Sequence, residues 1–235
     1  MSLSPPAALL VTGTDTDVGK TVVGSALLAA WRQLGRSVDA YKPVESGVEG
    51  EPADGRMLWE ACGRSRPLSE VCPTRLTAPL AAPVAARLEG VDLDPVAWQR
   101  EIARRAGRTD LLLIEGAGGL LSPLWDGGDA ATFAQRCELP ALVVAADRLG
   151  VINHVRLVVE ALERRAVPIV AVVLSRPEPA RPGDPSLASN AAEIGALIDP
   201  PVVGPLPFQP DLEPEALGAA LRGCPGADVL LPTMA

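Results

Sequence analysis

The chain has 235 residues, of which 48% are hydrophobic and only 3% aromatic, and its formal net charge is −8. The length and the apolar fraction are sufficient for a folded core, and we expect residues 1–235 to form a single domain. An acidic chain without a dense Lys/Arg run disfavours nucleic acid and anionic membranes as partners, and the scarcity of aromatic rings disfavours base stacking.

Histidine and cysteine usage excludes further chemistry. The only histidine, His154, rules out a multi-His metal site and disfavours a Ser-His-Asp triad. The four cysteines show no C-x-x-C spacing, so we expect free thiols in a reducing compartment. Residues 1–6 do not look like the start of a signal peptide, and no apolar run reaches the roughly 18 residues of a membrane span. We therefore expect a cytoplasmic protein.

Short apolar runs alternate along the chain with longer helical patterns. The runs lack in/out alternation, as is typical of parallel strands covered on both faces. This pattern predicts an α/β fold: a doubly wound, mostly parallel sheet in three layers, with helices on both faces and ligands beyond the carboxyl ends of the strands. The predicted strands are 7–12, 38–41, 111–114, 141–145, 169–174 and 202–203, and the predicted helices lie near 20–34, 54–62, 95–106, 130–136, 151–165 and 186–198.

Three segments interrupt this alternation. The polar segment 43–55 and the Pro/Ala-rich segment 67–83 are predicted to be loops, and so is the proline-rich segment 176–185. The stretch after Pro210 is compatible with a helix.

The first predicted strand runs directly into residues 13–21, Gly-Thr-Asp-Thr-Asp-Val-Gly-Lys-Thr. A strand, a glycine-bounded loop, Gly-Lys-Thr and then a helix is the context that a phosphate-binding loop requires. Its backbone N–H groups and the helix N-terminus attract phosphate, Lys20 adds a full charge, and the Thr21 hydroxyl can bind Mg²⁺. The spacing between Gly13 and Gly19 is one residue longer than in the standard pattern. The alternative, an ordinary strand–helix turn, is less favoured.

The only other lysine of the chain, Lys42, ends the second predicted strand, and Glu115 ends the third. The carboxyl ends of parallel strands share one rim, so both side chains are expected near the phosphate loop. A carboxylate there suits Mg²⁺, which prefers oxygen ligands. Asp54 is a candidate second acid. Glu45, Glu49 and Glu51 in the same segment compete with it.

Four sequence blocks together resemble dethiobiotin synthetases, a family of P-loop NTPases. They are residues 13–21, Lys-Pro-Val at 42–44 with Ser-Gly at 46–47, Glu-Gly-Ala-Gly-Gly at 115–119, and Leu-Gly-Val-Ile-Asn-His at 149–154. The blocks come in the family's order and spacing. The resemblance implies ATP-dependent closure of a cyclic urea from 7,8-diaminopelargonic acid and CO2. One amine captures CO2 as a carbamate, ATP converts it to a carbamic-phosphoric anhydride, and the second amine displaces phosphate to give dethiobiotin.

The resemblance also implies roles for individual residues. Lys20 would hold the β- and γ-phosphates, and Lys42 would stabilise the carbamate and the transferring phosphoryl group, which makes these two the catalytic residues. Mg²⁺ would be bound by Thr21, Asp54 and Glu115, and the diamine by Thr16 and Ser46. Gly150 and Asn153, supplied by a neighbouring subunit, would receive the distant carboxylate of the substrate, which implies a homodimer. For His154 in that block, a packing or helix-orienting role is favoured over a catalytic one. The residues implied in ATP binding are Asp17, Val18, Gly19, Lys20, Thr21, Val22, Asp54, Glu115, Gly116, Ala117, Gly118, Ser175, Arg176, Pro207, Phe208 and Gln209.

One position departs from the family. Many relatives carry an Asn-Asp pair after the strand at 169–174, and its Asn binds the adenine edge, whereas this chain has Ser175 and Arg176. A serine hydroxyl is shorter than an amide and cannot make the same two bonds. We therefore expect tolerance of other nucleoside triphosphates, although residues 207–209 still match the family's second base-side loop.

Two related functions remain as alternatives. Partition and septum-placement ATPases usually carry an additional lysine early in the loop, where this chain has Thr14 and Asp15. They also often carry a DNA or membrane anchor, which the acidic composition disfavours. Amide-forming ATPases of the cobalamin pathway would require a following glutaminase domain.

Overall fold

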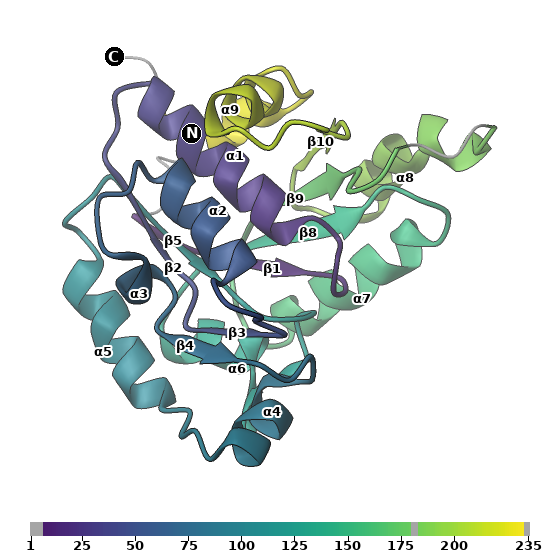
Figure 1. Ribbon diagram of the computed structural model, residues 1–235. Coiled ribbons are helices and arrows are strands. Elements are labelled where there is room, and N and C mark those ends of the chain that lie inside the picture. Colours follow the sequence, from purple (N-terminus) through teal and green to yellow (C-terminus); the bar gives the residue numbers. More distant parts are fainter. Residues whose placement is uncertain (1–6, 180–182, 233–235) are drawn as a thin grey trace.

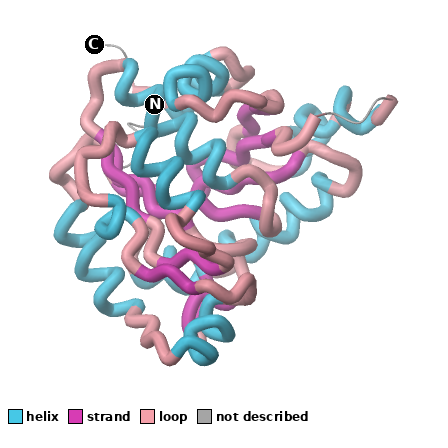
Figure 2. The backbone as a smooth tube through the Cα atoms, in the orientation of Figure 1, coloured by secondary structure: helices cyan, strands magenta, loops and turns pink. Residues whose placement is uncertain are grey.

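The centre of the protein is a parallel sheet of six strands. The computed structural model describes residues 7–179 and 183–232. The sheet order is β10-β9-β8-β1-β5-β2, and all neighbouring strands are parallel (Figures 1 and 2). The six predicted strands are therefore confirmed. Their bounds are β1 (Ala8–Gly13), β2 (Val38–Tyr41), β5 (Leu111–Glu115), β8 (Ala141–Ala146), β9 (Ile169–Ser175) and β10 (Val202–Leu206).

Helices cover both faces of this sheet, which confirms the three-layer architecture (Figure 1). Because side chains alternate along a strand, Leu9 and Val11 of β1 pack into one core cluster and Leu10 into the other. The first cluster is covered by α1 (Lys20–Gln33), α2 (Ala53–Ala61) and α9 (Pro214–Arg222). The second is covered by α4 (Ala82–Glu89), α5 (Pro95–Arg105), α6 (Ala130–Arg136), α7 (Val151–Glu163) and α8 (Asn190–Leu197).

The segments 43–55 and 67–83 are not plain loops, and that prediction was wrong. They contain β3 (Val44–Ser46) and β4 (Thr74–Leu76), which pair in parallel as a small second sheet, together with the short helix α3 (Leu68–Val71). The segments also include the starts of α2 and α4. Elements of three or four residues are too short to show a hydrophobic period, so the sequence pattern could not reveal them.

Smaller differences occur later in the chain. The glycine-rich stretch after β5 leads into a hairpin of β6 (Pro123–Trp125) and β7 (Gly128–Asp129), which was not predicted. The predicted helix at 186–198 is divided into a 3₁₀ turn, η1 (Pro185–Ala188), and α8. A second 3₁₀ turn, η2 (Ala227–Leu230), follows α9 near the C-terminus.

Two predictions fall partly outside the described residues. These are the lack of a signal peptide at residues 1–6 and the middle of the predicted loop at 176–185, where residues 180–182 are not described. Among the helices that the structure does describe, none is both long and apolar enough to cross a membrane.

Candidate functional site

A cleft of about 380 Å³ opens beyond the carboxyl ends of β1 and β2. The loop from β1 to α1 forms one wall. Gly19 at its end has φ +89°, and a Cβ there would lie 2.5 Å from the Ser175 hydroxyl oxygen, so only glycine fits. Asp17 also adopts a left-handed conformation, with φ +56°. This geometry turns the loop around the N-terminus of α1, where unpaired backbone N–H groups and the helix dipole favour an anion.

Lys20, the first residue of α1, lies inside this loop and is 7% exposed. Its Nζ donates a hydrogen bond to the Asp15 carbonyl at 2.9 Å. Burial lowers the pKa of Lys20 from its ordinary value. A phosphate in the loop would offer this ammonium group a far stronger partner than a carbonyl oxygen does.

Lys42 follows β2 and is the centre of a buried charge cluster. Its Nζ lies 2.5 Å from Glu115 Oε1 and 3.0 Å from Asp54 Oδ2. Burial works against the ammonium charge, but the two carboxylates outweigh it and raise the pKa of Lys42, which therefore stays protonated. The Thr21 hydroxyl donates to the same Glu115 oxygen at 2.9 Å. Four predicted residues thus converge on one point.

The oxygens of this cluster fit a magnesium ion. Glu115 is fully buried, and its second oxygen, Oε2, has no hydrogen-bond partner among the described residues, which is rare for a buried carboxylate. Asp54 stays ionised: burial opposes its charge, but Lys42 and the Thr21 hydroxyl lower its pKa overall. Two carboxylates and a hydroxyl beside a phosphate loop are the donors that Mg²⁺ prefers, with remaining positions left to water and phosphate.

Most of the predicted site residues lie around the cleft. Glu115 and Gly116 are buried beneath it, and Val18 packs into the core. Gly150 and Asn153 are exposed at the start of α7, outside the cleft. The predicted residues that line it are Thr16, Asp17, Gly19, Lys20, Thr21, Val22, Lys42, Ser46, Asp54, Ala117 and Gly118.

The predicted base-side residues do not line the cleft. Ser175 is 1% exposed and packs against Gly19. Arg176 pairs with Asp147 through Nε at 3.1 Å and Nη2 at 3.0 Å, and Asp147 also accepts a bond from Asn190 at 2.9 Å. Pro207, Phe208 and Gln209 follow β10, where Phe208 is 38% exposed.

A second cavity of about 540 Å³ adjoins the first. The two share Thr16, Ser46, Ala117 and Gly118 as lining residues. The far wall is more apolar, with residues 79–82 at the start of α4 and Pro123 of β6. An elongated molecule with one polar end could therefore extend from the charged cleft into this cavity.

Sequence reasoning missed three residues that line the cleft, Glu45, Met57 and Pro177. The sequence offers Glu45 only as a rival to Asp54 for a metal. In the structure its two oxygens accept the backbone N–H groups of Asp54 at 3.1 Å and Gly55 at 2.9 Å. Glu49 and Glu51, the other rivals, are exposed, and Glu51 pairs with Arg56. Asp54 is the acid of this segment that contacts Lys42.

Comparison with known proteins places this chain in a family. An AAA domain family model matches residues 7–216. The ATP-dependent dethiobiotin synthetase BioD of Anaeromyxobacter dehalogenans (strain 2CP-C) is 46% identical over 217 residues, which cover 91% of this chain and 96% of the relative. The enzyme of the same name from Aromatoleum aromaticum is 34% identical over 225 residues, covering 94% and 99%.

Solved structures of lower identity share the fold. The septum site-determining protein MinD complexed with Mg-ADP from Pyrococcus horikoshii is 17% identical, with a TM-score of 0.54 and coverage of 95% of this chain and 93% of that one. MinD from Aquifex aeolicus is 12% identical with a TM-score of 0.55 and the same coverage. At such identity the likeness concerns the fold alone, whereas the sequence relatives match over nearly their full length. The chain therefore belongs to the family of ATP-dependent dethiobiotin synthetases.

Proposed function

We propose that this chain, as an ATP-dependent dethiobiotin synthetase, closes the urea ring of dethiobiotin in the paired cavities described above. The observation that carries the proposal is the convergence of Lys20, Lys42 and three oxygen ligands on one rim, directly beside a cavity with an apolar wall. The phosphates of ATP would occupy the loop that turns around the N-terminus of α1. The diamine would pass Thr16 and Ser46, with its aliphatic chain toward residues 79–82.

The two lysines would supply charge stabilisation. Lys20 would leave the Asp15 carbonyl to hold the β- and γ-phosphates. Lys42, kept protonated by its carboxylate neighbours, would face the carbamate oxygen and the phosphoryl group that passes to it. Such a transfer needs positioning and preorganised charge rather than a protein nucleophile. Closure by the second amine would then form the C–N bond and release phosphate.

Thr21, Asp54 and Glu115 are the residues that would hold Mg²⁺. When bound, this ion neutralises negative charge on the phosphates. Lys42 keeps the two carboxylates in place beforehand, since it contacts both of them.

We further propose that the active unit is a homodimer. Leu121 and Leu157, the latter in the middle of α7, line one surface hollow and are 53% and 58% exposed, and Leu149 just before α7 is 82% exposed. The same hollow includes Thr14 and Asp15 of the phosphate loop. Exposed apolar side chains gathered around one hollow favour a protein partner. A second copy seated there would bring its own Gly150 and Asn153 near the substrate cavity.

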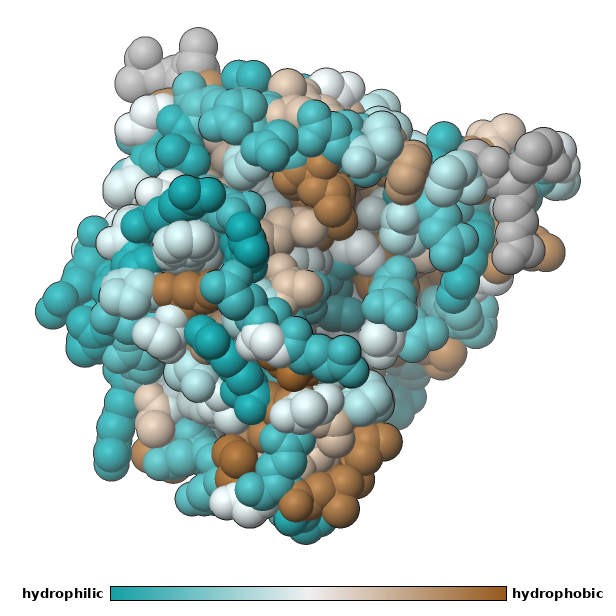
Figure 3. All heavy atoms as spheres, in the orientation of Figure 1, coloured by the Kyte–Doolittle hydropathy of each residue, from teal (hydrophilic) through white to brown (hydrophobic). Residues whose placement is uncertain are grey.

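Apolar side chains also gather on the face drawn in Figure 3, at its lower edge over α4, where Leu80, Val84, Leu88 and Val91 are exposed. Light scattering should give twice the mass of the 24.4 kDa chain if the homodimer forms.

We place the reaction in the cytoplasm, where free cysteines stay reduced.

Incubation with the diamine, bicarbonate and Mg-ATP tests the proposal directly. We expect dethiobiotin, identified by mass, in amounts matching the ADP released. ATP hydrolysis without dethiobiotin would contradict the proposal and favour a nucleotide-dependent switch.

A further inference from the structure

The N-terminus of α2 has no capping side chain of its own. Pro52 stands at the N-cap position and makes no side-chain hydrogen bond, so the first N–H groups of the helix need partners from elsewhere. Glu45 of β3 supplies them. Its Oε1 accepts from the Asp54 N–H at 3.1 Å and its Oε2 from the Gly55 N–H at 2.9 Å. A carboxylate at this end also interacts favourably with the helix dipole.

Glu45 is itself held firmly. It is 7% exposed and lies opposite Arg75 in the pairing of β3 with β4. The Cys72 thiol lies 3.8 Å from its Oε2. On the other side, a Cβ on Gly55 would lie 2.6 Å from Cys72 Cβ, so the first turn of α2 packs closely against the same residue. The second, smaller sheet therefore fixes the carboxylate, and the carboxylate fixes the helix.

The first turn of α2 carries Asp54, whose side chain reaches Lys42 at 3.0 Å while remaining 46% exposed. Fixing the backbone of a partly exposed acid favours such a contact, because less conformational freedom is then lost when the contact forms. Glu45 anchors the backbone N–H of this very residue. Both of its oxygens accept helix N–H groups, which directs the carboxylate toward the backbone of α2.

We infer that Glu45 is a positioning residue for the Mg²⁺ site, which acts by capping α2 and thereby holding Asp54 toward Lys42, Thr21 and Glu115. The inference rests on the proposed role of Asp54 as a magnesium ligand. Residues that orient a metal ligand typically change metal affinity by about 10–100-fold when removed.

Binding of a fluorescent ADP analogue, with Mg²⁺ and with EDTA, measures this role without turnover. The ratio of the two dissociation constants gives the gain in affinity due to magnesium. We expect Glu45→Ala to reduce that gain about tenfold while leaving affinity in EDTA unchanged. Glu45→Gln, which keeps one acceptor oxygen, should give a smaller loss. Glu51→Ala is the matched control, because it removes an exposed carboxylate from the same segment, and it should behave as the unmodified protein.

A double-mutant cycle separates positioning from general damage. If Glu45 acts through Asp54, Glu45→Ala should cost nothing further in an Asp54→Ala background. An unchanged magnesium gain in folded Glu45→Ala, or an equal loss in both backgrounds, would overturn the inference while leaving Asp54 as a ligand. If Asp54→Ala itself leaves the gain unchanged, the proposed ligand set fails and the inference with it. Should Glu45→Ala not fold, Glu45→Gln decides by the same criteria.

Discussion

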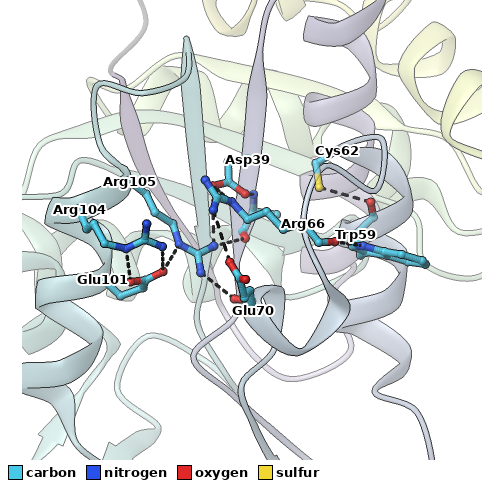
Figure 4. Close-up of polar contacts among 9 residues, drawn as sticks. Asp39, Trp59, Cys62, Arg66, Glu70, Glu101, Arg104 and Arg105 are labelled. Carbon is cyan, nitrogen blue, oxygen red and sulfur yellow. Dashed lines mark hydrogen bonds and ion pairs between the residues drawn. The ribbon is translucent and has the colours of Figure 1, made fainter.

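Two clusters of buried charge lie along one strand, and they differ in how completely their charges are paired. Asp39 within β2 belongs to the first, and Lys42, directly after the strand, belongs to the second. Figure 4 shows the first cluster, in which Asp39 accepts from Arg66 at 2.6 Å and lies 3.7 Å from Arg105. Both clusters join β2 to helices that follow it in the chain.

The Asp39 cluster is closed. Arg105 is 1% exposed, and its guanidinium donates to Glu101 at 2.5 Å, to the Glu70 carbonyl at 2.8 Å and to the Ala40 carbonyl at 3.3 Å. It also stacks on the ring of Tyr41 at 4.8 Å. These contacts tie α5 and α3 to the edge strand. Because they occupy Arg105 on all sides, we expect this cluster to serve the fold.

The Lys42 cluster is open. The Glu115 Oε2 atom lacks a partner within the part of the chain that the structure describes, and Lys42 and Asp54 border a cleft. A buried carboxylate with a spare oxygen costs stability unless a ligand arrives, since unmet polar groups in the interior are unfavourable. Burial of charge therefore does not by itself indicate function. A buried acceptor atom that lacks a hydrogen-bond partner beside a cavity does indicate it.

Lys42→Ala should give the largest effect. We expect dethiobiotin formation to fall by at least about a hundredfold, because a preorganised charge at the transferring group is lost. Stability without ligand should also fall, since the Glu115 carboxyl, whose pKa burial raises, would lose the ammonium group that pairs with it. Coupled ADP assays and thermal unfolding measure both. Near-normal turnover in a folded variant would contradict the proposed mechanism.

Arg105→Met should damage the fold instead. Breaking a buried, networked ion pair typically costs about 3–5 kcal/mol, which lowers Tm by roughly 10 °C in a chain of this size. At temperatures below the lowered Tm of the variant, kcat and KM for ATP should stay within about threefold of normal.

Arg104→Met is the matched control, because Arg104 contacts the same Glu101 but its side chain is 44% exposed. Its loss should cost under about 1 kcal/mol. If the two variants were equally stable, the closed cluster would not hold α5 and α3 to the edge strand as its contacts suggest.

The sequence predicted the open cluster better than the closed one. Lys42 and Glu115 each end or directly follow a recognisable strand, Thr21 lies in the recognisable phosphate loop motif, and parallel topology brings strand ends together. Arg105 sits at the end of an ordinary amphipathic helix, and nothing local distinguishes it from Arg104. Its burial depends on α3, an element too short to predict.

The role of Glu45 was hidden for a related reason. The segment that contains Glu45 shows no strand pattern in the sequence. A side chain that caps a helix nine residues further along the chain also leaves no local sequence motif. Local sequence pattern likewise does not distinguish Asp54 from Glu45 and Glu51, whereas in the structure Asp54 is the one of the three that contacts Lys42.

Nucleotide selectivity tests the base-side residues, which lie outside the open cluster. Ser175 is buried against Gly19 and Arg176 is engaged by Asp147, so neither side chain is free to bind a base edge. Site groups that bond a substrate edge give large discrimination, and their loss removes it. We expect kcat/KM for ATP to exceed that for CTP and GTP by less than about a hundredfold. A larger preference would show that another part of the site selects adenine.

Acidification tests the closed cluster with a smaller expected effect than Arg105→Met. The hydrogen bond from Arg104, with the added charge of Arg105, lowers the pKa of Glu101 from 4.5 to about 2, against the opposing effect of burial. A carboxyl group whose folded pKa is depressed stabilises the fold above its unfolded pKa and loses that contribution as the pH falls toward the folded value. Glu101→Gln should therefore be less stable at pH 7 by about 1–2 kcal/mol, and the deficit should shrink as the pH falls from about 5 toward 2.

Urea unfolding of both proteins at several pH values measures this difference, with activity at pH 7 as the check that the cleft is unaffected. A deficit that stays constant on acidification would mean that Glu101 contributes through packing rather than through its charge. A loss of activity at pH 7 would mean that the two clusters on β2 are coupled, because Lys42 directly follows the strand that Arg105 holds. Unchanged activity with a shrinking deficit would support their separation into a cluster for the fold and a cluster for the ligand.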